Sequence, residues 1–182
     1  MFKVTLRIAL ICLALQVIQS YRPEIMPLQI FYFPYLFHKS TLMLFLFTLF
    51  SHMFSHGNWP HILGNLEAGI PAMCYLEYKL GGPKMLKLYL ISGVIAALTQ
   101  GVLVPGGALI GASGAIFGCL TASCLLLCKG RASTALGMAL LTIVLLPQLA
   151  SMGGFDGIAH AAHVGGGITG LLIVAICHKK PI

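Results

Sequence analysis

Ser113 lies in a short glycine-rich motif, Gly111-Ala112-Ser113-Gly114, where a loop enters an apolar run. Small flanking residues let another backbone approach the hydroxyl, and amide N–H groups at a helix start stabilise an anion. Ser113 is therefore a candidate nucleophile. The same four residues are also common in membrane helices as a packing or capping element, and the motif alone does not decide between these interpretations.

His163 is the candidate partner of that serine, near the start of the last apolar run. Gly166 and Gly170 follow it by three and seven positions and share its helical face, and Gly114 and Gly118 form a similar pair after the serine. Close contact of the two faces would bring the hydroxyl within reach of the imidazole, which can act as general base. Alternatively, the histidine only hydrogen-bonds within a bundle and the glycines only serve packing.

His61 and Asn65 form a third polar group. Their spacing of four residues puts them on one face of a helix, one turn apart. Both side chains can donate hydrogen bonds to a developing oxyanion in a site shielded from water. The pair is equally suited to bonding a neighbouring helix, and both interpretations stay open at this point.

The remaining histidines raise the alternative of a metal site. His52 and His56 are four residues apart, and His160 precedes His163 by three. Possible ligands are His52, His56, His61 and His160, but the chain has no HExxH sequence and only four acidic residues. We therefore expect neither a metal nor an organic cofactor, and hydrogen bonding in loops or in the core is the expected role.

The composition assigns the chain to a bilayer. It is 58% hydrophobic and 8% charged, with a mean hydropathy of +0.95, whereas a soluble domain has about 25% charged residues. The formal net charge is +7, but the basic residues lie between apolar runs, which indicates membrane topology and contact with anionic lipid rather than nucleic acid. The six cysteines form no CxxC pair, which favours apolar packing over a disulfide framework or a thiolate zinc site.

Six apolar runs approach the roughly 20 residues that a spanning helix needs. They cover residues 4–19, 59–78, 85–104, 113–128, 132–150 and 160–177. The sequence therefore predicts one all-α membrane domain of six transmembrane helices over residues 1–182. A cleavable signal peptide is the second interpretation of the first run, which lacks a small-x-small cleavage site.

A further apolar run, residues 28–54, would add a seventh span. Six spans place nine of the eleven basic residues on the side of the two termini, which the positive-inside rule assigns to the cytoplasm. Those nine are Lys3, Arg7, Lys79, Lys84, Lys87, Lys129, Arg131, Lys179 and Lys180. A seventh span would weaken this bias, so we expect residues 21–58 to be a long non-cytoplasmic loop with helices lying in the interface.

Together these motifs resemble the rhomboid family of intramembrane serine proteases, and in particular its bacterial six-helix type. That family has a GxSG serine on the fourth helix, an A-H-x-x-G histidine on the sixth and an H-x-x-x-N on the second. This chain supplies Ser113, His163 with Gly166, and His61 with Asn65, in the same order on the corresponding helices. The resemblance extends over essentially the whole chain.

The resemblance implies roles for these residues. Ser113 and His163 would form a dyad without a carboxylate, and His61, Asn65 and the serine amide would line the oxyanion hole. Phe117, four residues after the serine, takes the place of an aromatic residue that packs on the catalytic imidazole. Glu77 resembles a structural acid of the family.

The chain also departs from the family. The Trp-Arg pair of the first loop is replaced by Phe47-Thr48, which puts loop geometry or lipid contact in doubt. The proline that marks inactive relatives near the serine is absent, because Ala112 occupies its place, and this favours an active enzyme.

The expected function is hydrolysis of peptide bonds in single-span membrane proteins, in a prokaryotic plasma membrane. The turns from Pro105 to Gly111 and from Gly153 to Gly157 are expected to line the path of water to the dyad. Two alternatives stay open: a catalytically inactive rhomboid-like protein that binds membrane clients, and a small channel or transporter, against which the scarcity of acidic residues argues.

Overall fold

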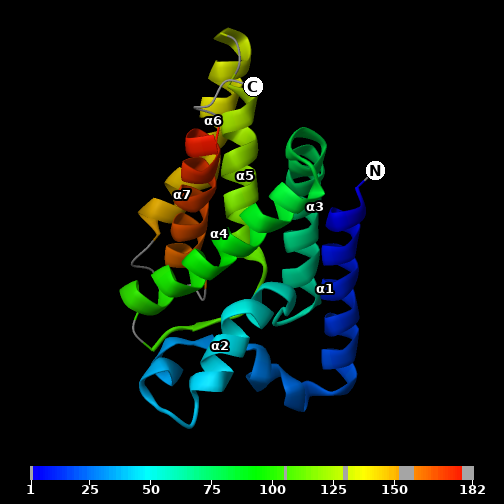
Figure 1. Ribbon diagram of the computed structural model, residues 1–182, viewed down its shortest axis with the longest axis vertical. Helices are drawn as coiled ribbons and strands as arrows, with labels where there is room; N and C mark the ends of the chain where they lie inside the picture. The colour runs from blue at the N-terminus through cyan, green and yellow to red at the C-terminus, as the bar shows by residue number, and fades with distance from the viewer. Residues whose placement is uncertain (1, 105, 129–130, 152–157, 178–182) are drawn as a thin grey trace.

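A computed structural model describes residues 2–104, 106–128, 131–151 and 158–177 (Figure 1). Within these ranges the chain forms seven α-helices, three short 3-10 helices and one two-stranded sheet. The six long helices are α1 (Lys3–Tyr21), α3 (Trp59–Leu80), α4 (Gly82–Leu103), α5 (Ser113–Leu127), α6 (Arg131–Ala150) and α7 (His160–Cys177). They cover the six apolar runs of the sequence, and the predicted helical bundle is confirmed.

The long helices have the surface of a bundle that faces lipid. Among the described residues, α1, α4 and α7 are both long and apolar enough to cross a membrane, and α5 and part of α6 are shorter apolar helices. Large apolar side chains such as Leu6 on α1 and Leu172 on α7 are more than half exposed. Side chains of this kind on an outer face are stable in contact with hydrocarbon, where the helical backbone satisfies its own hydrogen bonds.

The segment between α1 and α3 forms short elements at one end of the bundle (Figure 1). They are η1 (Pro23–Gln29), β1 (Phe31–Tyr32), η2 (Phe33–Phe37), α2 (Leu42–Ser51) and η3 (His52–Phe54). The ten residues of α2 rise only about 15 Å, whereas a bilayer core is about 30 Å thick. This segment is therefore a loop with short helices, as the distribution of basic residues predicted.

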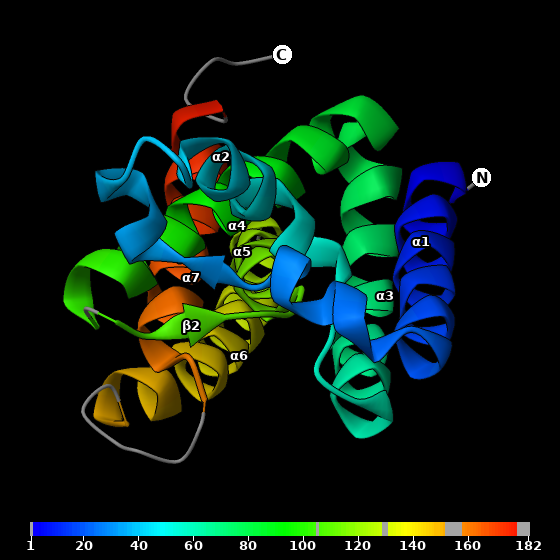
Figure 2. The ribbon, with the colours of Figure 1, turned by 90° about the horizontal axis from the view of Figure 1, so that it is seen from below.

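A two-stranded sheet connects this loop to the chain just before α5 (Figure 2). Strand β1 pairs antiparallel with β2 (Ala108–Leu109), and Phe31 is the partner of Leu109. The sequence predicts no strand here, because two residues are too few to form an alternating pattern. Phe31 is fully buried and its ring centroid lies 5.5 Å from that of Phe45, which fixes α2 beside the sheet.

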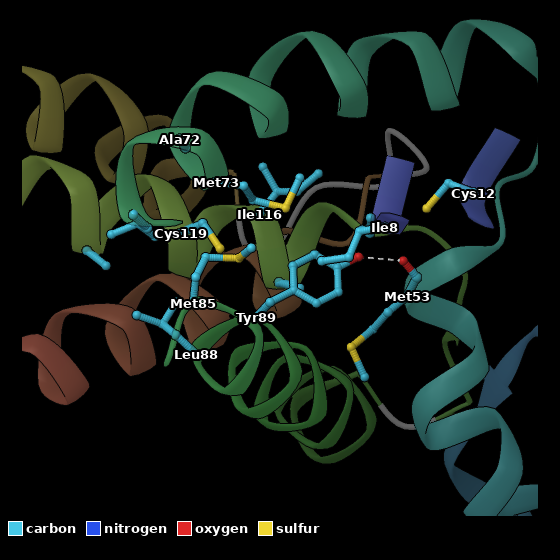
Figure 3. Close-up of a cluster of buried hydrophobic side chains, with 14 of the residues drawn as sticks. Ile8, Cys12, Met53, Ala72, Met73, Met85, Leu88, Tyr89, Ile116 and Cys119 are labelled. Carbon is cyan, nitrogen blue, oxygen red and sulfur yellow. Dashed lines mark hydrogen bonds between the residues drawn. The ribbon is translucent and has the colours of Figure 1, made fainter. Parts of the chain in front are cut away.

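Tyr89 of α4 lies in a buried cluster to which α1, α3, α4, α5, α7 and η3 contribute (Figure 3). Its hydroxyl donates a hydrogen bond of 2.8 Å to the carbonyl oxygen of Met53. Ile8, Met73 and Ile116 belong to the same cluster. Burial of a tyrosine is stable here because its hydroxyl has this partner, and the bond joins the loop to the bundle.

Glu77 of α3 caps the start of α1. Its carboxylate accepts hydrogen bonds from the Val4 amide (3.1 Å), from the Thr5 amide (2.9 Å) and from the Thr5 hydroxyl (2.8 Å). The first amides of a helix have no partner within it and carry a partial positive charge. Glu77 supplies the acceptor that the first turn of α1 itself lacks.

Helices α5 and α7 meet backbone to backbone through two pairs of glycines. A Cβ on Gly166 would overlap the carbonyl oxygen of Gly114, and one on Gly170 would overlap that of Gly118. Thr121 adds a 2.7 Å hydrogen bond from its hydroxyl to the Gly167 carbonyl oxygen. The two small-residue faces that the sequence predicted, one on each helix, thus pack against each other.

Replacing Gly166 by alanine should separate the two helices. The added Cβ meets backbone atoms of Gly114, which cannot rotate away as a side chain can. We expect Gly166→Ala to lower the free energy of unfolding by roughly 3 kcal/mol, at the upper end of overpacking costs, measured by thermal unfolding in detergent. Gly64→Ala on α3 is the matched control, because its Cβ meets nothing within 4 Å. Equal stability of the two variants would contradict the predicted clash.

Candidate active site

The turn before α5 has a conformation that requires glycine. Gly111 has a φ of +123°, a region that L side chains rarely adopt, and a Cβ there would lie 2.7 Å from a ring carbon of His61. The Gly111 amide donates to the His52 carbonyl oxygen (2.9 Å), and the Ala112 amide lies 3.5 Å from His56 Nε2. The first loop therefore fixes the turn that precedes Ser113.

Ser113 and His163 lie within hydrogen-bond distance. Ser113 is the first residue of α5 and His163 lies in the first turn of α7, and their Oγ and Nε2 atoms are 2.8 Å apart. Phe117, one turn along α5, stacks on the imidazole with ring centroids 4.2 Å apart and planes 5° from parallel. Only 8% of the His163 surface is exposed. A hydroxyl and a shielded imidazole in this arrangement are suited to proton transfer.

The other nitrogen of His163 contacts a residue that the sequence analysis did not single out. Nδ1 lies 2.7 Å from Oε1 of Gln148, which comes directly after Pro147 in α6. The same Oε1 lies 2.7 Å from Nδ1 of His160. The sequence does contain a signal for Gln148: it is an amide side chain within an apolar run, and polar groups in a membrane span are costly and often functional.

His61 and Asn65 lie on α3, one helical turn apart. The Gly57 amide approaches His61 Nδ1 at 3.5 Å, so a neutral ring carries its hydrogen on Nε2, the nitrogen nearer to Gly111. The Asn65 amide nitrogen donates one hydrogen to the His61 carbonyl oxygen (2.9 Å) and has a second hydrogen to donate. Both side chains can thus offer an N–H to an oxyanion.

A cavity of about 550 Å³ brings these residues together. Its lining includes His61, Asn65, Ser113, Phe117 and His163. The walls also carry apolar side chains from β2, from α5 and from the segment just before α7, namely Leu109, Ile116, Leu120 and Ile158. Convergent polar groups in an apolar cleft are the usual pattern of a binding site.

Several predicted residues lie around this cavity rather than in its lining. Gly114 and Gly166 form the helix contact described above, and Gly111 forms the turn. The turn from Gly153 to Gly157, which was expected to line the path of water, lies outside the described residues. No group of three or more His, Cys, Asp or Glu side chains suited to a metal ion occurs among the residues that the structure describes.

Two histidines of the first loop are buried beside the turn. Burial lowers the pKa of His52 from 6.5 to about 4, and it lowers the pKa of His56 to about 3, with a smaller contribution from the neighbouring His61. The ring centroids of His56 and His61 lie 5.2 Å apart, edge to face. Both loop histidines are therefore neutral near pH 7.

The cavity and its helices define an integral membrane protein with a serine and a histidine in contact in its interior. The family model described as Rhomboid domain matches residues 45–180. A protein described as Rhomboid-like protease 5, from Toxoplasma gondii, is 33% identical over 124 residues, which cover 66% of this chain and 15% of that protein. The chain thus spans a small part of the relative that it matches.

The chain belongs to the rhomboid family, as its motifs predicted. Members of this family act on membrane proteins within the bilayer. The match begins in α2 and includes every residue named above as lining the cavity.

The buried loop histidines predict a pH-dependent stability. Because their folded pKa values lie below 6.5, the unfolded chain binds more protons, and the free energy of unfolding should fall as the pH drops from about 6.5 toward 4. Well above pH 6.5 both histidines are neutral in the folded and the unfolded chain, so they do not make the free energy of unfolding depend on pH. The measurement is the unfolding temperature in detergent at pH 7.5, 5.5 and 4.5. His52→Gln should show a shallower decline than the wild type, and an unchanged slope would contradict the role of His52.

Proposed function

We propose that this chain is an intramembrane serine endopeptidase that hydrolyses peptide bonds in or near transmembrane segments. The observation that carries the proposal is the 2.8 Å distance between Ser113 Oγ and His163 Nε2 in the cavity. Family membership and the protease description of the relative support it. Ser113 is then the nucleophile and His163 the general base.

In the proposed acylation, His163 Nε2 accepts the hydroxyl proton as Ser113 Oγ attacks the scissile carbonyl carbon. The carbonyl oxygen becomes an oxyanion, and His163 then gives its proton to the leaving amine. A water molecule repeats the sequence on the acyl-enzyme: His163 takes its proton, the hydroxide oxygen attacks, and the proton returns to Ser113 Oγ as the acid product leaves.

The oxyanion would lie between the start of α5 and α3. Ala112 makes no side-chain cap at the start of α5, and the first amides of a helix have no partner within it. The Ser113 amide, the Nε2–H of His61 and the second amide hydrogen of Asn65 are the proposed donors. Donors held in place before the reaction need no reorientation as charge develops, which is the source of their effect.

Phe117 and the glycines have supporting roles in this proposal. The stacked Phe117 ring limits rotation of the His163 imidazole. Gly114 and Gly166 allow the helix approach that the dyad needs, and the conformation of Gly111 turns the chain into α5. Residues 108–110 line the cavity, which is consistent with water entering beside the turn before Ser113.

The proposed substrates are single-span membrane proteins whose helix unwinds near the non-cytoplasmic face. The proposed location is a prokaryotic plasma membrane with both termini in the cytoplasm. The charge distribution supports this orientation, because the described ends of α3 and α4 carry Lys79, Lys84 and Lys87 on the side of the N-terminus.

Cleavage should depend on both members of the dyad. In proteoliposomes containing a single-span model substrate, Ser113→Ala should abolish detectable cleavage and His163→Ala should reduce it by about 10²-fold or more, the lower end of general acid–base contributions. The measurement is the product peptide by mass spectrometry. Unfolding temperatures of both variants provide the control for loss of fold.

A fluorophosphonate probe separates activity from substrate choice. It should label Ser113 in the wild type, with little labelling in His163→Ala. Cleavage that survives Ser113→Ala would overturn the mechanism. Absence of both labelling and cleavage in a folded wild type would favour the alternative of an inactive client-binding protein.

The proposed orientation can be measured independently of activity. A single cysteine introduced at exposed Lys39 in the first loop, in a background without native cysteines, should react with a membrane-impermeant reagent added from outside intact cells. The same substitution at exposed Lys84 is the control and should be protected. Reaction at Lys84→Cys with protection of Lys39→Cys would reverse the orientation.

A further inference from the structure

Gln148 holds one oxygen atom between two imidazoles. Its Oε1 lies 2.7 Å from Nδ1 of His163 and 2.7 Å from Nδ1 of His160. Both histidines are buried in the first turn of α7, and their ring centroids lie 6.2 Å apart, edge to face. The amide therefore joins α6 to the two histidines of α7 at a single point.

This contact determines where the hydrogen of a neutral His163 lies. An amide oxygen accepts hydrogen bonds and donates none, so Nδ1 of each histidine carries the hydrogen. In His163 the lone pair is then on Nε2, the atom 2.8 Å from Ser113 Oγ. Of the two neutral tautomers, only this one can accept the serine proton.

We propose that Gln148 is a positioning residue that fixes the tautomer and ring orientation of His163, and that His160 holds the Gln148 oxygen in place. This inference rests on the proposed serine protease function. An acidic residue bonded to Nδ1 has the corresponding role in Ser-His-Asp triads. An amide supplies the acceptor without an ionised group in a membrane interior, where a charge is costly.

The contact is not needed to dock α7. The glycine pairs and the 2.7 Å bond from Thr121 to Gly167 already hold α7 against α5. On its other side, Ala162 donates its amide hydrogen to Oε1 of Gln100 in α4 (3.2 Å). Loss of the Gln148 oxygen should therefore change the chemistry more than the fold.

The test compares Gln148→Leu with Gln148→Glu. Leucine removes the acceptor, so kcat for the model substrate should fall by about tenfold or more, a part of the roughly 10² to 10⁴ that general acid–base catalysis contributes, with KM within twofold. Glutamate keeps an acceptor at the same distance along the side chain, so kcat should recover to within about threefold of the wild type.

Thr142→Val is the matched control. Its hydroxyl bonds the Met138 carbonyl oxygen within α6 and is exposed, so this variant loses a polar group of the same helix without touching the cavity. Its kcat and its unfolding temperature should equal those of the wild type. Gln148→Leu should share that unfolding temperature.

Three outcomes would overturn the inference. If Gln148→Leu has the same kcat as the wild type, Gln148 does not position His163, and the proposed protease function is unaffected. A Gln148→Glu variant as impaired as Gln148→Leu would mean that the amide acts as a donor. A ¹⁵N spectrum of the histidines of the wild type that assigns hydrogen to Nε2 of neutral His163 would exclude the tautomer, even if no variant folds.

The part assigned to His160 is tested by a double-mutant cycle. If His160 acts through Gln148, then His160→Leu should lower kcat less than Gln148→Leu, and the double variant should equal Gln148→Leu. If the reductions in kcat of the two single variants instead multiply in the double variant, His160 acts independently of Gln148. A folded wild type that neither cleaves the substrate nor reacts with the fluorophosphonate would contradict the protease function itself. The ¹⁵N spectrum would then still show which nitrogen of neutral His163 carries the hydrogen.

Discussion

The approach of α5 and α7 at the glycine pairs is the constraint on which the rest of the site depends. Ser113 directly precedes one contact residue, Gly114, and His163 lies three residues before its partner, Gly166. The distance between the hydroxyl and the imidazole is thus set by backbone contact, which is stiffer than contact between long side chains. A membrane offers little hydrophobic driving force between helices, so close backbone packing has to supply the attraction.

A second constraint comes from the first loop, which contacts the turn that precedes Ser113 in the chain. The pairing of β1 with β2 and the bond from the Gly111 amide to His52 hold the turn before α5. The helix contact therefore positions the two reacting atoms, and the loop positions the turn beside them. Met53 links the two systems, because its carbonyl oxygen is bonded to Tyr89 in the core of the bundle.

The sequence predicted the helices and the family because both depend on local or ordered patterns: apolar runs, small-residue faces and motif order. It also led to Ser113, His163 and Phe117, which the structure brings into one cluster, while their catalytic roles stay predictions. The two-residue strands were missed because their pairing joins residues 76 and 78 positions apart in the sequence, and no local pattern encodes it. Gln148 was missed because its contact depends on how α6 packs on α7, which neither spacing nor composition specifies.

The cap that Glu77 places on α1 has a consequence for how the protein can be shortened. Residue 77 lies near the C-terminal end of α3, where the helix dipole disfavours a negative charge, and the amides of Val4 and Thr5 offset it. A fragment starting at residue 45, where the family match begins, would keep every residue that lines the cavity and would leave this carboxylate without its donors. We expect such a fragment to need a compensating change at Glu77 before it folds as well as the longer chain.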